Sequence, residues 1–148
     1  MIEEFSGANR FLSNFWPVPN GVIFERVSFP TVEHAYQAAK SLRRDDWLHV
    51  AALAKPGDAK RWGRLCEVRK DWDVVKITVM TDLVRQKFQQ EPLRGMLLRT
   101  GAEELREGNT WNDVFWGVCS GRGENRLGKI LMQVRRELRG SIKQGDAS

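Results

Sequence analysis

The sequence predicts an α+β protein that is mainly helical, folds as one compact domain of residues 1–148 and carries a small β component. Apolar residues recur at helical spacing in several segments. By contrast, only the segment 22–29 combines the β-branched and aromatic residues typical of a strand. A chain of 148 residues is also long enough for a single domain to bury roughly two thirds of its surface.

The first thirty residues are predicted to form turns, an aromatic loop and a strand. Residues 6–9 have turn composition. The segment 11–17 holds three aromatic residues and ends at a proline, which favours a loop that serves either as a core plug or as a ligand platform. Asn14 within it could contact a base edge or a sugar hydroxyl once water is excluded. An Asn20-Gly21 turn leads into the strand 22–29.

The rest of the chain is predicted to be mostly helical. Pro30 and Thr31 mark the start of a helix that runs to about Arg43. Further helices are expected at 45–53 (capped by Asp45 or Asp46), 58–67, 74–90, 93–99 and 127–138, and the segment 102–107 fits either a strand or a helical turn. Buried stripes are predicted at Ile77, Met80, Val84 and Phe88, and at Leu127, Ile130, Leu131, Val134 and Leu138. Residues 108–109 are a predicted turn, and residues 140–148 a frayed polar tail.

Composition limits the classes of function. The formal net charge of +5 favours an anionic partner. Cys66 and Cys119 are far apart, so no disulfide framework is expected. His34 and His49 lack metal-ligand spacing, and we expect neither a metal nor a cofactor. With no signal peptide and no apolar run near ~18 residues, the protein is expected in the cytoplasm, without a membrane partner.

The helix that starts at Thr31 carries the clearest candidate chemistry. Glu33, Gln37 and Lys40 recur at steps of four and three, which places a carboxylate, an amide and an amine on one helix face. Beside them, Val32, Ala35, Tyr36 and Ala39 form an apolar stripe. An ordinary amphipathic helix with a solvated polar side would show the same pattern, so both interpretations stand.

A second candidate region lies at residues 110–128. Asp113 stands between Trp111 and Trp116; buried there, its carboxyl could stay protonated and transfer a proton, but it could equally cap a turn. The glycine-rich segment that follows opens a helix and could present backbone N–H groups to a phosphate, with Arg122 and Arg126 beside it. It does not match a Walker motif, so this signal is weak by itself.

Four motifs, in this order, resemble the YbiA-like, or NADAR, family. They are Phe11-Leu12-Ser13-Asn14-Phe15, then Glu33-His34-Ala35-Tyr36-Gln37 with Lys40, then Trp111-Asn112-Asp113 with Trp116-Gly117, then Gly123-Glu124-Asn125-Arg126-Leu127-Gly128. The resemblance extends from about Phe11 to Leu138 and departs at Trp16, where a tyrosine is more usual. It implies a compact, mainly helical fold and an N-glycosidase. Members act on ribosylamino-pyrimidine phosphates of riboflavin synthesis, or remove ADP-ribose from guanine in DNA or nucleotides.

Both substrate types share a ribose C1′ bonded to an exocyclic amino nitrogen, and two routes would break this bond. In one, Glu33 or Asp113 acts as acid or base while the other carboxylate stabilises an oxocarbenium-like state. In the other, Lys40 attacks C1′ and forms a Schiff base that water then hydrolyses. The positive helix end favours ionised Glu33, which suits a base better than an acid. Desolvation and nearby Arg43 and Arg44 would lower the pKa of Lys40, as a nucleophile requires.

The resemblance and the residue types together give a predicted site. Glu33, Lys40 and Asp113 are the predicted catalytic residues. The predicted substrate-binding residues are Asn14, Phe15, Trp16, Tyr36, Gln37, Trp116, Arg122, Asn125 and Arg126. The expected partner is a phosphorylated riboside or an ADP-ribosyl substrate, including ADP-ribosylated DNA. The alternatives are a non-catalytic module that binds nucleotides or nucleic acid with the same aromatics and basic charge, and a purely structural partner domain.

Overall fold

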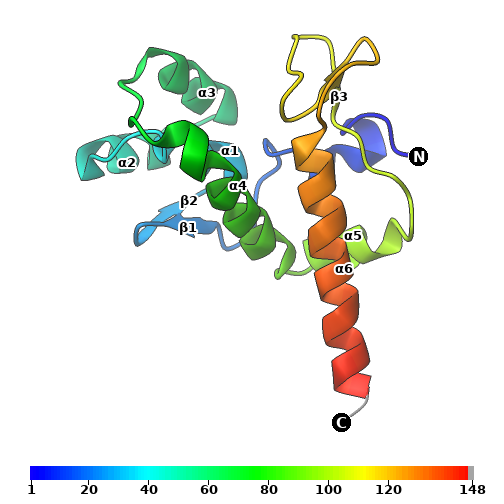
Figure 1. Ribbon diagram of the computed structural model, residues 1–148. Helices are drawn as coiled ribbons and strands as arrows, with labels where there is room; N and C mark the ends of the chain where they lie inside the picture. Colours follow the sequence, from blue (N-terminus) through cyan, green and yellow to red (C-terminus); the bar gives the residue numbers. More distant parts are fainter. Residues whose placement is uncertain (147–148) are drawn as a thin grey trace. The chain divides into compact units, whose positions relative to one another are not determined.

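The computed structural model describes residues 1–146, with side chains as far as residue 142. Helices dominate and the strands are short, so the prediction of a mainly helical α+β fold is confirmed. The chain packs as two compact units (Figure 1). We call Asn14–Gln90 the central unit, and Met1–Ser13 together with the described chain from Glu91 onward the terminal unit.

The central unit is built around helix α1 (Val32–Ala38). Helices α2 (Arg44–Ala51), α3 (Pro56–Leu65) and α4 (Trp72–Phe88) all contact α1, as do strands β1 (Val22–Phe24) and β2 (Val27–Phe29). Every residue of α1 is buried as a result. The short helix therefore has no solvated face, and its polar side chains lie inside the unit.

The predicted strand 22–29 is in fact a hairpin. β1 and β2 pair in antiparallel register, with Val22 opposite Phe29. The two residues between them, Glu25 and Arg26, have φ values of 50° and 66°, the left-handed conformation of a two-residue hairpin turn. The prediction of one continuous strand was wrong because such turns usually carry Asn or Gly, and neither residue is present here.

Two glutamines, one in α4 and one just after it, hold the hairpin through hydrogen bonds to its backbone. Gln86 accepts a hydrogen bond from Ile23 N at 2.7 Å and donates to Ile23 O at 2.8 Å. Gln90 just beyond the helix likewise accepts from Asn20 N at 2.9 Å and donates to Gly21 O at 2.9 Å. These side-chain amides form hydrogen bonds with backbone groups in and just before β1, which fixes the short hairpin in position.

The start of α1 matches the prediction, but its end does not. Thr31 caps the helix, accepting a hydrogen bond from His34 N at 3.0 Å. The helix ends at Ala38, not near Arg43, because Lys40 turns its carbonyl toward Arg69 N at 2.7 Å. The hydroxyl of Ser41 then accepts from Arg43 N at 3.0 Å. Lys40 consequently stands in the turn after the helix, not on its surface.

The other helices of the central unit also begin earlier or with other caps than expected. The N-cap of α2 is Arg43, and neither Asp45 nor Asp46 caps it. Helix α3 already starts at Pro56, a position that suits proline because its missing N–H is not needed there. Helix α4 starts at Trp72 after Asp71. Of its predicted stripe, Met80, Val84 and Phe88 are buried and Ile77 is half-buried.

The terminal unit contains the 3₁₀-helix η1 (Gly7–Leu12), helices α5 (Leu93–Arg99) and α6 (Arg126–Asp146), and strands β3 (Gly108–Asn109) and β4 (Val118–Cys119), which pair in parallel. Residues 108–109, a predicted turn, are thus a short strand. The segment 102–107 forms neither of the two predicted elements; Leu105 makes an isolated bridge to Ile2. The predicted apolar stripe of α6 is buried. Helix α6 continues past Gly140 to Asp146, where a frayed tail was predicted; residues 147–148 lie outside the described residues.

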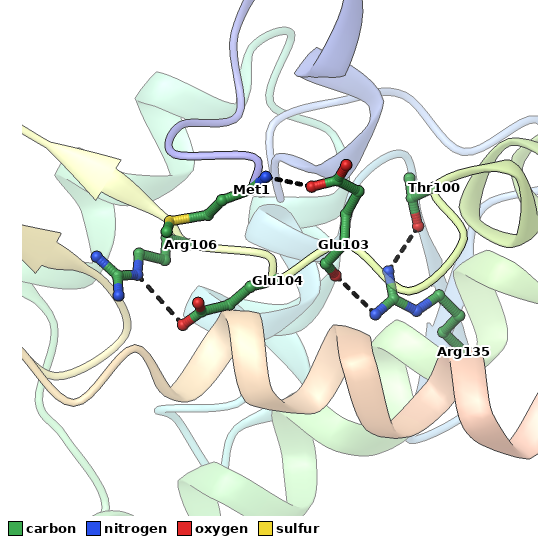
Figure 2. A network of polar contacts seen from close by, with 6 residues as sticks. All are labelled: Met1, Thr100, Glu103, Glu104, Arg106 and Arg135. Atoms are coloured by element: carbon green, nitrogen blue, oxygen red, sulfur yellow. Dashed lines mark hydrogen bonds and ion pairs between the residues drawn. The ribbon is translucent and has the colours of Figure 1, made fainter.

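A network of polar contacts ties α6 to the segment after α5 (Figure 2). The guanidinium of Arg135 donates to Thr100 Oγ1 at 2.8 Å and to Glu103 O at 2.7 Å. The carboxylate of Glu103 pairs with the amino group of Met1. Only 5% of Arg135 is exposed, so these contacts compensate a charge that would otherwise be costly to bury.

Candidate active site

The polar side chains of α1 form a buried pair. Glu33 and Gln37 are 7% and 5% exposed, and Gln37 Nε2 donates to Glu33 Oε1 at 2.8 Å. The backbone of Glu33 is held as well, since its N–H donates to Asn14 O at 3.0 Å. The interpretation of this stripe as a solvated helix face is therefore wrong. A buried carboxylate next to a buried amide is the arrangement expected of a functional site.

Gln37 also faces helix α3 at an unusually close approach. A Cβ on Gly63 would overlap Gln37 Oε1 and stand 3.3 Å from Lys40 Nζ. A larger residue at position 63 would therefore displace the Gln37 amide from its present place. Within the described part of the chain, Gln37 Oε1 has no hydrogen-bond partner. A glycine in a helix interior is a signal for such close approach, but the sequence analysis did not use it.

Lys40 completes this group. Burial lowers the pKa of its amine, Cys66 and Glu33 act in the opposite direction, and Arg64 and Lys76 lower it further. The predicted cations Arg43 and Arg44 are not the ones that act on it. Its Nζ lies 5.8 Å from the centre of the Tyr36 ring. A partly desolvated amine beside a carboxylate is suited to nucleophilic or acid–base chemistry.

Aromatic and amide side chains surround α1. Tyr36 is 7% exposed and packs on Trp72, with ring centres 5.1 Å apart. Asn14 is buried, and its Nδ2 contacts Met80 Sδ at 3.6 Å. Phe15 is 40% exposed, and Trp16 is half-buried. The Phe15 ring is partly exposed, and Lys60 Nζ lies 6.0 Å from its centre, whereas Tyr36 and Asn14 are packed inside the unit.

His34 has a structural role. It is fully buried, and its Nε2 lies 3.0 Å from Leu53 O. A carbonyl only accepts, so Nε2 carries the proton, and the Thr31 hydroxyl donates to Nδ1 at 2.7 Å. Burial lowers the pKa of His34, in keeping with this neutral form. Among residues 1–146, no group of three or more His, Cys, Asp or Glu side chains is placed to hold a metal ion.

A cleft opens beside the turn that carries Lys40. Its volume is about 710 Å³. It is lined by Ser41, Leu42, Arg43, Asp46, Trp62 and residues 66–71. Cys66 lines the cleft and lies close enough to Lys40 for the thiol and the amine to influence each other's charge. Burial is the main reason that the pKa of Cys66 is raised. The sequence analysis did not predict Trp62 or Cys66, which lie in a segment without a recognisable motif.

The remaining predicted residues belong to the terminal unit. Both polar atoms of the Asn125 side chain are used inside it: Oδ1 accepts from Glu107 N at 3.0 Å, and Nδ2 donates to Leu105 O at 2.9 Å. Arg126 donates to Glu124 at 3.0 Å and lies over Phe115, which also packs edge-on against Trp116. Arg122 is exposed in a turn. Roles of these residues in substrate binding stay predictions.

Asp113 shapes a turn of the terminal unit. Its Oδ1 accepts from Trp116 N at 2.9 Å and Phe115 N at 3.2 Å. This geometry is that of the cap that the sequence analysis gave as the alternative to proton transfer. A supporting role of Asp113 in catalysis stays a prediction.

We expect Asp113→Ala to lower the free energy of unfolding by about 1 kcal/mol, because two backbone N–H groups lose their acceptor. Asp113→Asn should cost much less, since the amide oxygen can replace Oδ1. Urea denaturation of both variants measures the change in the free energy of unfolding. Turnover by the stable Asp113→Asn variant then shows whether the carboxylate has a chemical role. Unchanged turnover would rule out a catalytic carboxylate at this position.

These features define a class: a small, mainly helical α+β protein with a buried acid–amide pair on one helix and a partly desolvated lysine in the turn that follows it. None of the helices within residues 1–146 combines the length and apolar character of a membrane span. The NADAR domain family model matches residues 3–139, so the chain belongs to the NADAR family.

Similar proteins agree with this membership. N-glycosidase Npun_R5314 of Nostoc punctiforme is 40% identical over 134 residues, which cover 86% of this chain and 84% of that protein. N-glycosidase YbiA of Escherichia coli K12 is 39% identical over 132 residues, covering 85% and 79%. Riboflavin biosynthesis protein VVA0006 of Vibrio vulnificus is 39% identical over 135 residues, but these are only 35% of its length. The NMR structure of E. coli YbiA matches 97% of this chain and 89% of its own, with a TM-score of 0.78 and 34% identity. The predicted YbiA-like fold is confirmed.

Proposed function

We propose that this protein is an N-glycosidase that hydrolyses the bond between ribose C1′ and an exocyclic amino nitrogen. The observation that carries the proposal is the buried Glu33–Gln37 pair next to the partly desolvated Lys40. The names of two relatives, both N-glycosidases, support the reaction class. The substrates we propose are ADP-ribosylated guanine, in nucleic acid or as a nucleotide, or a ribosylamino-pyrimidine phosphate.

The lysine route fits the site best. An exocyclic amino nitrogen keeps a proton, so the sugar ring can open to an imine at C1′. The neutral amine of Lys40 attacks C1′, the bond from C1′ to the base nitrogen breaks, and the departing amine takes a proton that Glu33 supplies. Water then adds to the Schiff base, with Glu33 as the base, and releases ribose and the free lysine. A nucleophilic lysine needs a lowered pKa, and burial lowers it here.

Direct attack by water is the second route to the same products. Glu33 would activate the water, and a second carboxylate, for which Asp113 is the candidate, would stabilise the oxocarbenium-like state. Glu33 and Lys40 do not share one helix face as predicted, because α1 ends at Ala38, before Lys40. The electrostatic effect of Glu33 on Lys40 supports a shared site nonetheless.

Residue type and exposure suggest how the substrate is held. Phe15 and Trp16 offer stacking surface for a base, and Tyr36 forms the wall behind Lys40. Asn14 and Gln37 would fix hydroxyl or base edges. Trp116, Asn125 and the arginines Arg122 and Arg126 are the proposed contributors from the terminal unit. The net charge of +5 suits either phosphorylated substrate, so charge does not choose between them.

The decisive experiment offers the purified protein both substrates separately. One is an oligonucleotide with an ADP-ribosylated guanine, and the other a ribosylamino-pyrimidine phosphate. We expect one of them to yield the free amino base and the ribose-bearing fragment, detected by chromatography and mass spectrometry, over a control with protein omitted. Tight binding whose affinity falls steeply with salt, but with no release from either substrate, would instead identify a non-catalytic nucleic-acid binding module.

A further inference from the structure

Gln37 contacts Glu33 and lies near Lys40. Its Nε2 donates to Glu33 Oε1 at 2.8 Å. A Cβ built on Gly63 would overlap Gln37 Oε1 and stand 3.3 Å from Lys40 Nζ, so the amide oxygen and the amine lie close to the same backbone position, without a hydrogen bond between them. Gln37 is only 5% exposed, and its Oε1 has no hydrogen-bond partner among the described residues. A buried carbonyl without a partner is costly, and the flexible Lys40 side chain is a nearby donor.

The orientation of this amide depends on the proton of Glu33. An ionised carboxylate only accepts, so it draws Nε2 toward itself and turns Oε1 toward Lys40. An oxygen at that place favours an ammonium group, which only donates. When Glu33 carries a proton, its hydroxyl donates to Oε1 and the amide reverses. The NH₂ group then faces Lys40 and needs the lone pair of a neutral amine.

We propose that Gln37 is a positioning residue that makes Glu33 and Lys40 hold a single proton between them. The amide stabilises two arrangements: ionised Glu33 with charged Lys40, and protonated Glu33 with neutral Lys40. In passing from the first to the second, one proton leaves Nζ and one arrives on the carboxyl, while the amide gains and loses none. The second arrangement is the one that the lysine route requires. This inference rests on the proposed function for its catalytic meaning, although the coupling itself is a property of the free protein.

Other charges around Lys40 come from every element that packs against it. Glu33 lies on α1, Arg64 on α3, Cys66 follows α3, and Lys76 lies on α4. Replacing the neutral Gln37 with the neutral methionine leaves all of these charges in place. A change in the titration of Lys40 or of Glu33 after Gln37→Met therefore reports the loss of the amide group and not a change in the charges around Lys40.

The test is to titrate Lys40 and Glu33 by NMR in protein labelled at the lysine Cε and glutamate Cδ carbons. In Gln37→Met we expect Lys40 to lose its proton at lower pH, because the amide oxygen near its ammonium is gone. Glu33 should keep its proton to higher pH, because the hydrogen bond from Nε2 is gone, and we expect each shift to be about one pH unit. The pH range over which Glu33 and Lys40 together hold one proton thus narrows at its acidic and at its alkaline end. Gln133→Met, at an exposed hydrogen bond to Glu137 on α6, should leave both titrations unchanged. Unchanged titrations in a folded Gln37→Met would overturn the proposal.

A measurement on the unmodified protein covers the case in which Gln37→Met does not fold. The side-chain NH₂ signals of Gln37 should shift with pH at the midpoint of Glu33, because the amide reverses when the carboxyl takes up its proton. Signals that stay constant across that titration contradict the coupling. Neither readout needs turnover, so failure of the coupling is distinct from failure of the glycosidase proposal. Should the enzyme be active, the bell-shaped pH profile of kcat/KM should narrow in Gln37→Met.

Discussion

Lys40→Met is expected to reduce kcat by about 10³-fold or more, because the variant lacks the group that attacks C1′. The fold should survive. The backbone carbonyl of Lys40 accepts a hydrogen bond from Arg69 N, which the substitution leaves in place, and methionine is a flexible apolar side chain that can fill the half-buried space of the lysine stem. Steady-state kinetics on the substrate that turns over measures the loss, and circular dichroism checks the fold.

Two companion experiments distinguish the role of Lys40 as a nucleophile from its role as a positive charge. Lys40→Arg keeps a cation that can bind phosphate but cannot form a Schiff base, so it should be as inactive as Lys40→Met. Borohydride added during turnover should attach the sugar fragment to the peptide that contains Lys40. As a matched control, Lys129→Met changes an exposed lysine of α6 and should leave kcat unaffected. Near-normal turnover in Lys40→Met, with no trapped adduct, would leave direct water attack as the route.

The pH dependence follows from the same amine. Burial lowers the pKa of Lys40, so the neutral nucleophile becomes available at lower pH than for an exposed lysine. Because the reactive form has a neutral Lys40 and a proton on Glu33, activity should peak while the pair holds one proton and fall at higher pH, when the pair has lost it. The lowered pKa of Lys40 places this fall at lower pH than an exposed lysine would.

Local chemistry explains which parts of this site the sequence predicted. The cap at Thr31 and the order of Glu33 and Gln37 on one face depend only on near neighbours along the chain, and both are present. The end of α1 depends on Arg69, which lies 29 positions after Lys40 in the sequence. The N–H of Arg69 donates a hydrogen bond to the Lys40 carbonyl, which is then not used to continue the helix. No local pattern encodes that contact.

Tertiary context also explains the other differences. Glu25 and Arg26 adopt a turn that their propensities do not favour, because Gln86 of α4 and Gln90 just beyond it fix the neighbouring backbone. The amide of Asn125 matches a family motif, yet its hydrogen bonds hold residues 105–107 in the terminal unit. A motif thus identified a residue whose side chain holds the fold locally, and its role in substrate binding stays a prediction.

Lys87→Met is expected to stabilise the protein, and to do so most strongly below pH 7. Lys87 is 1% exposed in α4, its Nζ lies 5.0 Å from the centre of the Phe88 ring, and burial lowers its pKa from 10.5 to about 7. The shift corresponds to an upper bound of about 5 kcal/mol for burying the charged form. Replacing buried charges with apolar side chains of similar volume typically gains about 1–4 kcal/mol, which is the gain we expect near pH 6.

The sign of the pH dependence follows from proton binding. Between pH 7 and 10.5 the unfolded chain holds the Lys87 proton and the folded chain has released it, so the stability of the native sequence rises with pH across this window. Lys87→Met removes this dependence, and its advantage over the native sequence should shrink from pH 6 to pH 10. Urea denaturation of both proteins at pH 6, 8 and 10 measures the difference, with the exposed Lys129→Met as a control expected to change little at any pH. A gain that is equal at all three pH values would show that Lys87 is charged inside the folded protein throughout, held by contacts strong enough to offset its burial.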